Sequence, residues 1–140
     1  MKELTLRAKT ENLNQVLEFV DNLLEEKNCP MNLVFELDIA VEELFVNIAH
    51  YAYAPEEGDA TIRISFVNDD VIITFIDSGM PYNPWAKEDP DTTLSLEERQ
   101  IGGLGIYMVK NSMDEIGYEY ADGKNVVTIK KCILDKNKEQ

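Results

Sequence analysis

The sequence predicts an α+β fold, a two-layer α/β sandwich whose mixed, mainly antiparallel sheet is covered on one face by helices. Some segments repeat their apolar residues at helical spacing, and shorter segments alternate or run apolar as strands do. These elements follow the order strand, two helices, two strands, long loop, helix, two strands. One sheet with helices packed against one face is the economical arrangement for that order.

One strand and two helices are expected before the middle of the chain. Leu4, Leu6 and Ala8 alternate with polar residues, which predicts the first strand. Apolar residues then recur three and four positions apart, which predicts amphipathic helices over about 13–27 and 32–53. Each helix therefore has one face to bury. The apolar stripe of the second helix consists of Val34, Leu37, Val41, Leu44, Phe45 and Ile48.

Four strands and a third helix are expected in the rest of the chain. Of these four strands, the first two are joined into an antiparallel hairpin by the polar turn Asn68-Asp69-Asp70, and the last two are joined by Asp122-Gly123. Between the pairs lie a loop over 78–101, long enough to be functional, and a helix that ends near Asp114. The four strands are expected over about 61–66, 71–76, 116–121 and 126–133.

The charge of the chain excludes some classes of protein. Its 140 residues include 27 acidic and 13 basic side chains, so the net charge is −14. Nucleic-acid binders need a basic surface, and an anionic membrane would repel this chain, so neither partner is expected. No apolar signal core or membrane-spanning run is visible. We therefore expect a cytoplasmic protein with one domain over 1–134 and a polar tail over 135–140.

Three polar residues of the second helix could carry chemistry. Glu43 and Asn47 are four residues apart, so their side chains are neighbours, and His50 follows on a line away from the apolar stripe. A carboxylate can accept a proton, and an amide oxygen suits a hard cation such as Mg²⁺. A solvated polar face would give the same pattern, and the helix alone favours that simpler reading.

Two glycine-containing segments are also candidates. Asp77 and Gly79 follow an apolar strand, where Asp can accept a hydrogen bond from an amino group and Gly permits close approach by a flat ligand. A plain turn explains this segment equally simply. The run Gly-Gly-Leu-Gly over 102–105 opens a helix, whose N-terminal N–H groups favour an anion such as phosphate. A flexible joint is the alternative there.

Taken together in this order, these segments resemble the GHKL (histidine-kinase-like) ATPase superfamily. Within it, the chain is similar to the small stand-alone anti-sigma-factor serine/threonine kinases, over residues 4–131. The stretch 42–47 resembles the N-box, and 77–84 resembles the first glycine box with its proline-rich continuation. The stretch 102–106 and the later Met113-Asp114 resemble the second glycine box and the helix after it.

The resemblance implies a site for ATP and Mg²⁺. It assigns Glu43 as the general base and Asn47 as the Mg²⁺ ligand. It assigns Asp77 as the acceptor for the adenine amino group and Gly79 as the glycine against which the base lies. An ATP lid is implied at about 80–101. The remaining nucleotide-binding positions that it implies are His50, Pro81, Gly102, Gly103, Leu104, Gly105 and Asn125.

The resemblance also implies an activity and partners. The chain is expected to be an ATP-dependent serine/threonine protein kinase and anti-sigma regulatory factor. Such a protein phosphorylates an anti-sigma-factor antagonist and sequesters a sigma factor. The alternative is a nucleotide-gated protein-binding switch without significant phosphotransfer. Relatives commonly dimerise, so a homodimer is left open, and the acidic surface fits a partner with basic patches.

Overall fold

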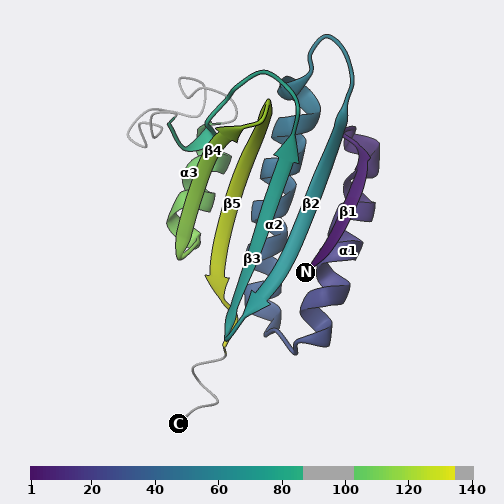
Figure 1. Cartoon of the computed structure of the whole chain (residues 1–140). Helices are drawn as coiled ribbons and strands as arrows, with labels where there is room; N and C mark the ends of the chain where they lie inside the picture. The colour runs from purple at the N-terminus through teal and green to yellow at the C-terminus, as the bar shows by residue number, and fades with distance from the viewer. Residues whose placement is uncertain (87–102, 135–140) are drawn as a thin grey trace.

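A sheet with helices on one face forms the protein (Figure 1). The computed structural model describes residues 1–86 and 103–134. The strands are β1 (Lys2–Arg7), β2 (Asp59–Val67), β3 (Asp70–Asp77), β4 (Glu115–Ala121) and β5 (Lys124–Cys132). The helices are α1 (Leu13–Glu26), α2 (Met31–Asn47) and α3 (Gly103–Ser112). Their order along the chain is the expected one, and the predicted α+β sandwich is confirmed.

The strands form one sheet in the order β1-β2-β3-β5-β4. All four pairings among the described strands are antiparallel, so the sheet lacks the parallel pairing that a mixed sheet would contain. The strand β3 is central and pairs with β2 and β5. Its register places Asp77, the last residue of β3, opposite Asn125 near the start of β5. Two polar residues far apart in sequence thereby become neighbours.

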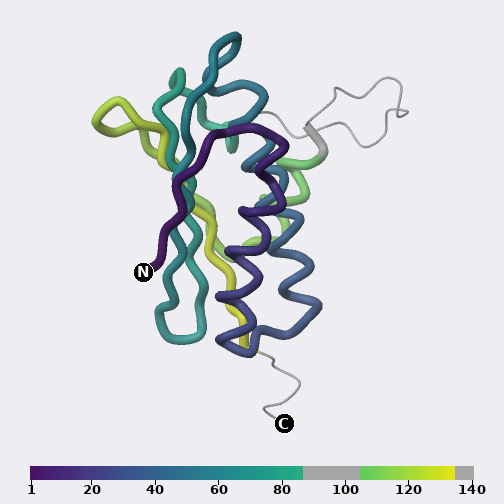
Figure 2. The backbone as a smooth tube through the Cα atoms, turned by 90° about the vertical axis from the view of Figure 1, so that its right-hand side faces the viewer, coloured from purple at the N-terminus to yellow at the C-terminus, as the bar shows by residue number. Residues whose placement is uncertain are grey.

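The core lies between the sheet and the helices, which form two layers when the sheet is viewed from its edge (Figure 2). Every second residue of β3 is buried, and so are Ala60, Ile62 and Ile64 of β2, as expected of strands with one covered face. The predicted stripe of α2 is buried except for Val34, which is partly exposed. The largest fully buried side chains include Phe45, Phe75, Leu24, Leu37, Ile62, Ile64, Ile73 and Ile129.

The second helix differs from the expected helix over 32–53. Its α-helical part ends at Asn47, and one turn of π-helix continues over Ile48–Ala52. Such turns insert an extra residue into the helical path and occur often at functional sites. No helix in the described residues has both the length and the apolar composition needed to cross a membrane.

Candidate functional site

A cavity of about 370 Å³ opens between the end of α2, the π-helical turn and the strands β3 and β5. Its size lies within the range of small-molecule sites, and its lining is mainly apolar with a few polar groups, as in such sites. The apolar lining includes Leu44, Ile48, Phe75, Met80 and Val127. The polar lining consists of Asn47, Asp77, Asn125 and the tyrosines Tyr51 and Tyr82.

Asn125 is the centre of a buried hydrogen-bond network in this cavity. Its side-chain amide donates to Oδ1 of Asp77 and to the carbonyl oxygen of Met80, each at 2.9 Å. Its Oδ1 accepts from the backbone N–H of Tyr82 at 3.0 Å and from the hydroxyl of Tyr118 at 2.6 Å. The hydrogen-bonding capacity of the side chain is therefore fully used. Asn125 fixes the segment that follows β3 against the sheet.

Asp77 keeps one carboxylate oxygen available. The side chain is only 5% exposed, and its Oδ1 accepts from Asn125 and from the backbone N–H of Gly79 at 2.9 Å. Within the described part of the chain, Oδ2 has no hydrogen-bond partner. This oxygen can accept a hydrogen bond, and an amino group of a ligand would supply the donor. The cavity thus fits a flat base with an exocyclic amino group.

Gly79 lies directly on the π-helical turn. A Cβ atom at this position would overlap the backbone carbonyl of Ala52. The next residue, Met80, donates its N–H to the same carbonyl oxygen at 3.0 Å. Only glycine permits this approach, because any side chain would push the segment after β3 away from α2. The glycine therefore holds one wall of the cavity close to the other.

Glu43 and the start of α3 are also in contact. A Cβ atom at Gly105 would overlap the carboxylate of Glu43, so the first turn of α3 packs on that side chain. The N-terminus of a helix presents unpaired N–H groups and attracts anions. Asn47, one turn after Glu43 on α2, lines the cavity. A carboxylate, the first turn of α3 and an amide that lines the cavity therefore lie close together.

Other predicted positions lie elsewhere. His50 is exposed and lines a separate cavity of about 180 Å³ beside Lys9, Glu11 and Glu57, so the structure does not bring it to the main cavity. Pro81 is exposed between two residues that line the main cavity. Gly103 and Leu104 lie in the first turn of α3. Gly102 and residues 87–101 of the expected ATP lid lie outside the described residues.

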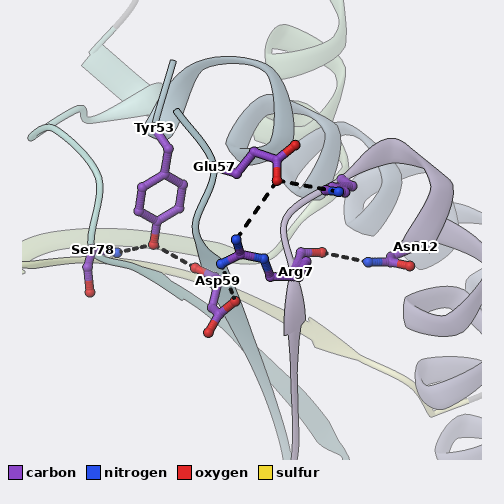
Figure 3. Close-up of polar contacts among 7 residues, drawn as sticks. Arg7, Asn12, Tyr53, Glu57, Asp59 and Ser78 are labelled. Carbon is purple, nitrogen blue, oxygen red and sulfur yellow. Dashed lines mark hydrogen bonds and ion pairs between the residues drawn. The ribbon is translucent and has the colours of Figure 1, made fainter. Parts of the chain in front are cut away.

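Tyr53 ties the elements around the cavity together (Figure 3). Its hydroxyl donates to the carbonyl oxygen of Asp59 at 2.6 Å and accepts from the N–H of Ser78 at 2.7 Å. A Cβ atom at Gly58 would overlap its ring, so the loop before β2 packs closely on it. The side chain of Asp59 in turn pairs with Arg7 at 3.3 Å. Tyr53 thereby anchors the residue that follows Asp77.

The sequence gives no spacing signal for the tyrosines of the site. Tyr51 and Tyr82 line the cavity, and Tyr118 bonds Asn125. Tyr118 can be placed only through the sheet register, in which it lies opposite the buried Val127. Its inward position follows from the pairing of β4 with β5 and from no local pattern.

Comparison with known proteins adds family relationships to this geometry. A family model described as the histidine kinase-like ATPase domain matches residues 6–131. Serine/threonine-protein kinase BtrW of Bordetella bronchiseptica is 25% identical over 128 residues, which cover 91% of this chain and 89% of that protein. Serine-protein kinase RsbW of Listeria monocytogenes is 28% identical over 100 residues, covering 68% of this chain and 64% of that protein.

Two further similarities extend the comparison. Serine-protein kinase RsbW of Bacillus mycoides is 29% identical over 99 residues, covering 68% of this chain and 62% of that protein. The match thus spans less than two thirds of these RsbW proteins. The solved structure of the Acinetobacter baumannii histidine kinase AdeS is similar with a TM-score of 0.52 and 16% identity, covering 96% of this chain and 70% of that one. This last likeness concerns the fold alone.

Proposed function

The chain belongs to the histidine kinase-like ATPase family, and from this premise we propose that it is an ATP-dependent serine/threonine protein kinase that acts as an anti-sigma factor. It phosphorylates an anti-sigma-factor antagonist protein on a hydroxyl group and sequesters a sigma factor. The relatives named as serine or serine/threonine kinases support the kinase part of this proposal. We also propose a cytoplasmic location, and the homodimer stays open.

The main cavity binds the nucleoside part of ATP in this proposal. The unpartnered oxygen of Asp77 accepts the adenine amino group, and Phe75 and Val127 supply apolar contact to the ring. The triphosphate extends toward the N-terminus of α3, where backbone N–H groups offset its negative charge. The nucleotide is therefore oriented with its adenine at Asp77, which can accept from an amino group, and its phosphates at the start of α3, which favours an anion.

Asn47 would hold Mg²⁺ together with phosphate oxygens and water. Mg²⁺ bound with nucleotides uses few protein ligands and keeps several waters, so one amide oxygen beside the phosphates fits this ion. Among the described residues, no group of three or more His, Cys, Asp or Glu side chains is arranged to hold a metal. The ion neutralises phosphate charge and supports in-line transfer when it is bound.

In this proposal Glu43 is the general base, and the observation that supports this role is its contact with Gly105. Gly105 packs on the Glu43 carboxylate, so the carboxylate lies at the helix end that receives the phosphates. There it can accept the proton of an incoming serine or threonine hydroxyl as the oxygen attacks the terminal phosphorus, the bond from that phosphorus to the bridging oxygen breaks, and ADP leaves. Phosphoryl transfer depends mainly on positioning and charge neutralisation, which this juxtaposition supplies.

The test compares Glu43→Gln with the wild type and with Glu119→Gln, an exposed position on β4. We expect Glu43→Gln to bind ATP with unchanged affinity in calorimetry, because the amide keeps the shape of the side chain. Transfer from ATP to an antagonist protein, measured with Mg²⁺ and radiolabelled ATP, should fall at least ~100-fold, as for removal of a general base. The Glu119→Gln variant should transfer at the wild-type rate.

Other results would contradict parts of the proposal. Equal transfer rates for Glu43→Gln and the wild type would remove the assigned role of Glu43. Wild-type protein that forms no phosphoprotein, but binds a sigma factor with an affinity that depends on the nucleotide, would support the nucleotide-gated switch instead. If transfer continues after chelation of divalent cations, the requirement for Mg²⁺ and the assigned role of Asn47 are both contradicted.

A further inference from the structure

The central helix of the helical layer carries an exposed apolar ridge. The helix α2 lies between α1 and α3 behind the sheet (Figure 1). Its sheet-facing residues are buried, yet Met31, Phe35 and Ile39 are 79%, 68% and 37% exposed. These three residues, here called the α2 ridge, are four positions apart and form one row on the outer face. Large apolar side chains aligned on a surface mark an interaction site.

The row of the α2 ridge leads to the candidate site. The next residues at the same spacing are Glu43 and Asn47. With a rise of about 1.5 Å per residue, Glu43 lies about 18 Å further along the helix axis than Met31, and the row winds partly around α2 between them. A protein seated on the ridge would therefore reach the proposed base with its own surface. An apolar ridge elsewhere on the molecule would have no such continuity with the chemistry.

The charge of the chain indicates which kind of molecule would bind the α2 ridge. The helix α2 has no Lys or Arg, and the net charge of the chain is −14. Of its acidic residues, Glu36 pairs with Lys131 at 3.7 Å and Asp38 lies near Asp21 of α1. A second copy of the chain would bring acidic surfaces together, and an anionic membrane would be repelled. A protein with an apolar centre and basic residues around it complements both properties. Exposed Glu42 lies one turn after Asp38 and close to the ridge row.

We propose that the α2 ridge docks the protein that accepts the phosphate, with basic residues of that protein facing exposed Glu42 beside the ridge. Docking brings the acceptor hydroxyl along the row to Glu43, and Phe35 is the central anchor. This inference rests on the proposed kinase function, because it assigns the occupant as the phosphate acceptor. Large side chains at the centre of an interface contribute most of its affinity, and Phe35 has that position in the ridge.

The test measures binding of an anti-sigma-factor antagonist protein to the full chain by calorimetry in the presence of nucleotide. We expect Phe35→Asp to weaken this binding at least ~10-fold, as expected for a central anchor. Its affinity for ATP should be unchanged, because Phe35 is not among the residues that line the cavity. The matched control is Val67→Asp, because Val67 is 51% exposed at the far end of β2, and it should bind the antagonist normally.

A second variant examines the charge complementarity. Glu42→Lys should slow association with the antagonist and reduce its dependence on salt, because charges around an interface act mainly on the association rate. Stopped-flow measurements at low and high salt would show both effects. Equal association rates for Glu42→Lys and the wild type would overturn the electrostatic part of the proposal.

Failure of docking and failure of the kinase function are distinguishable. If the antagonist binds in a way that depends on Phe35, but the wild type transfers no phosphate to it, the docking site is supported and the kinase function is contradicted. Normal antagonist binding by Phe35→Asp overturns the docking site whatever the transfer rate. Loss of sigma-factor binding alone, or a wild-type dimer that Phe35→Asp converts to a monomer, would assign the ridge to another occupant and also overturn the proposal.

Discussion

Asp77 and Asn125 are buried polar residues that the fold places side by side. They are 5% and 3% exposed, and each depends on the other for a hydrogen bond at 2.9 Å. Buried polar groups persist where hydrogen bonds satisfy them. Asn125 is satisfied by protein groups alone, whereas Asp77 retains one oxygen without a donor within the described residues. This asymmetry supports the proposal that Asp77 meets the ligand and Asn125 holds Asp77 in place.

The first prediction concerns the base preference of Asp77. In Asp77→Asn, the amide oxygen can still accept from Gly79 and Asn125, but the unpartnered oxygen becomes an amino group. That group opposes the adenine amino group and can donate to the carbonyl oxygen of guanine. We expect the affinity for ATP to fall at least ~10-fold, because the new amino group and the adenine amino group are both donors and leave each other unpaired. The ratio of ATP affinity to GTP affinity should fall by a larger factor, because guanine offers an acceptor to the new group. Calorimetry with both nucleotides measures this.

Asp69→Asn, a change on the exposed β2–β3 turn, is the control for the same measurement and should leave both affinities unchanged. If Asp77→Asn bound ATP as tightly as the wild type, the assigned contact with adenine would be wrong. The thermal unfolding temperature of the variant shows separately whether the network around Asn125 is intact.

At the scale of elements, the packed helices α1 and α2 each place one carboxyl group near the other, Asp21 on α1 and Asp38 on α2. Oδ1 of Asp21 and Oδ1 of Asp38 are buried and have no hydrogen-bond partner within the described residues. Burial, with the nearby Asp21 and Glu42, raises the pKa of Asp38 from 3.8 to about 8. A protonated Asp38 can donate to Asp21, which relieves the repulsion between the two helices.

The second prediction concerns the pH dependence of this helix pair. The pKa of Asp38 is higher in the folded chain, so the folded chain holds a proton between about pH 4 and about pH 8 that the unfolded chain has released. Folding stability therefore falls as pH rises through this window. Asp38→Asn removes the titration. The unfolding temperature of Asp38→Asn minus that of the wild type should therefore increase by about 4 °C from pH 5.5 to pH 9, a value that allows for solvent screening.

Circular dichroism at several pH values measures this difference, and Asp69→Asn serves again as the control because its side chain is exposed. The control should differ from the wild type by the same amount at every pH. A constant difference for Asp38→Asn as well would show that the buried pair does not titrate in this window.

At the scale of the whole molecule, the net charge of −14 opposes the compact state. Like charges on a folded surface repel one another over distances that salt shortens. Most ion pairs of the described residues, such as Arg63 with Glu3 at 2.7 Å, are at least partly exposed and contribute little. Self-repulsion should therefore outweigh the loss of these pairs when salt is added.

The third prediction follows from this balance. We expect the unfolding temperature to rise by several degrees when salt increases from about 20 mM to about 300 mM, because the Debye length falls more than threefold. Sodium chloride and choline chloride should have the same effect if general screening is the cause. An unfolding temperature that falls with salt would show that attractive surface pairs dominate.

Much of the fold was predictable because its signals are local. Apolar periodicity predicted α1, the buried stripe of α2 and the hairpin of β2 and β3, and the structure confirms them. The helix predicted over 32–53 is confirmed, but nothing in the sequence predicted that its last turn is π-helical. This turn contacts Gly79 through Ala52, a contact between segments distant in sequence that no local pattern reveals.

The sequence by itself determined the order of the elements, the side of each that is buried, and the residue types available for chemistry at Glu43, Asn47, Asp77 and Gly105. These depend on periodicity and on the properties of single side chains. Only the tertiary structure decided that Asp77 meets Asn125, that Gly105 packs on Glu43, and that His50 lies in another cavity. Such placements depend on strand register and helix packing, which are set by contacts between distant segments and leave no local pattern in the sequence.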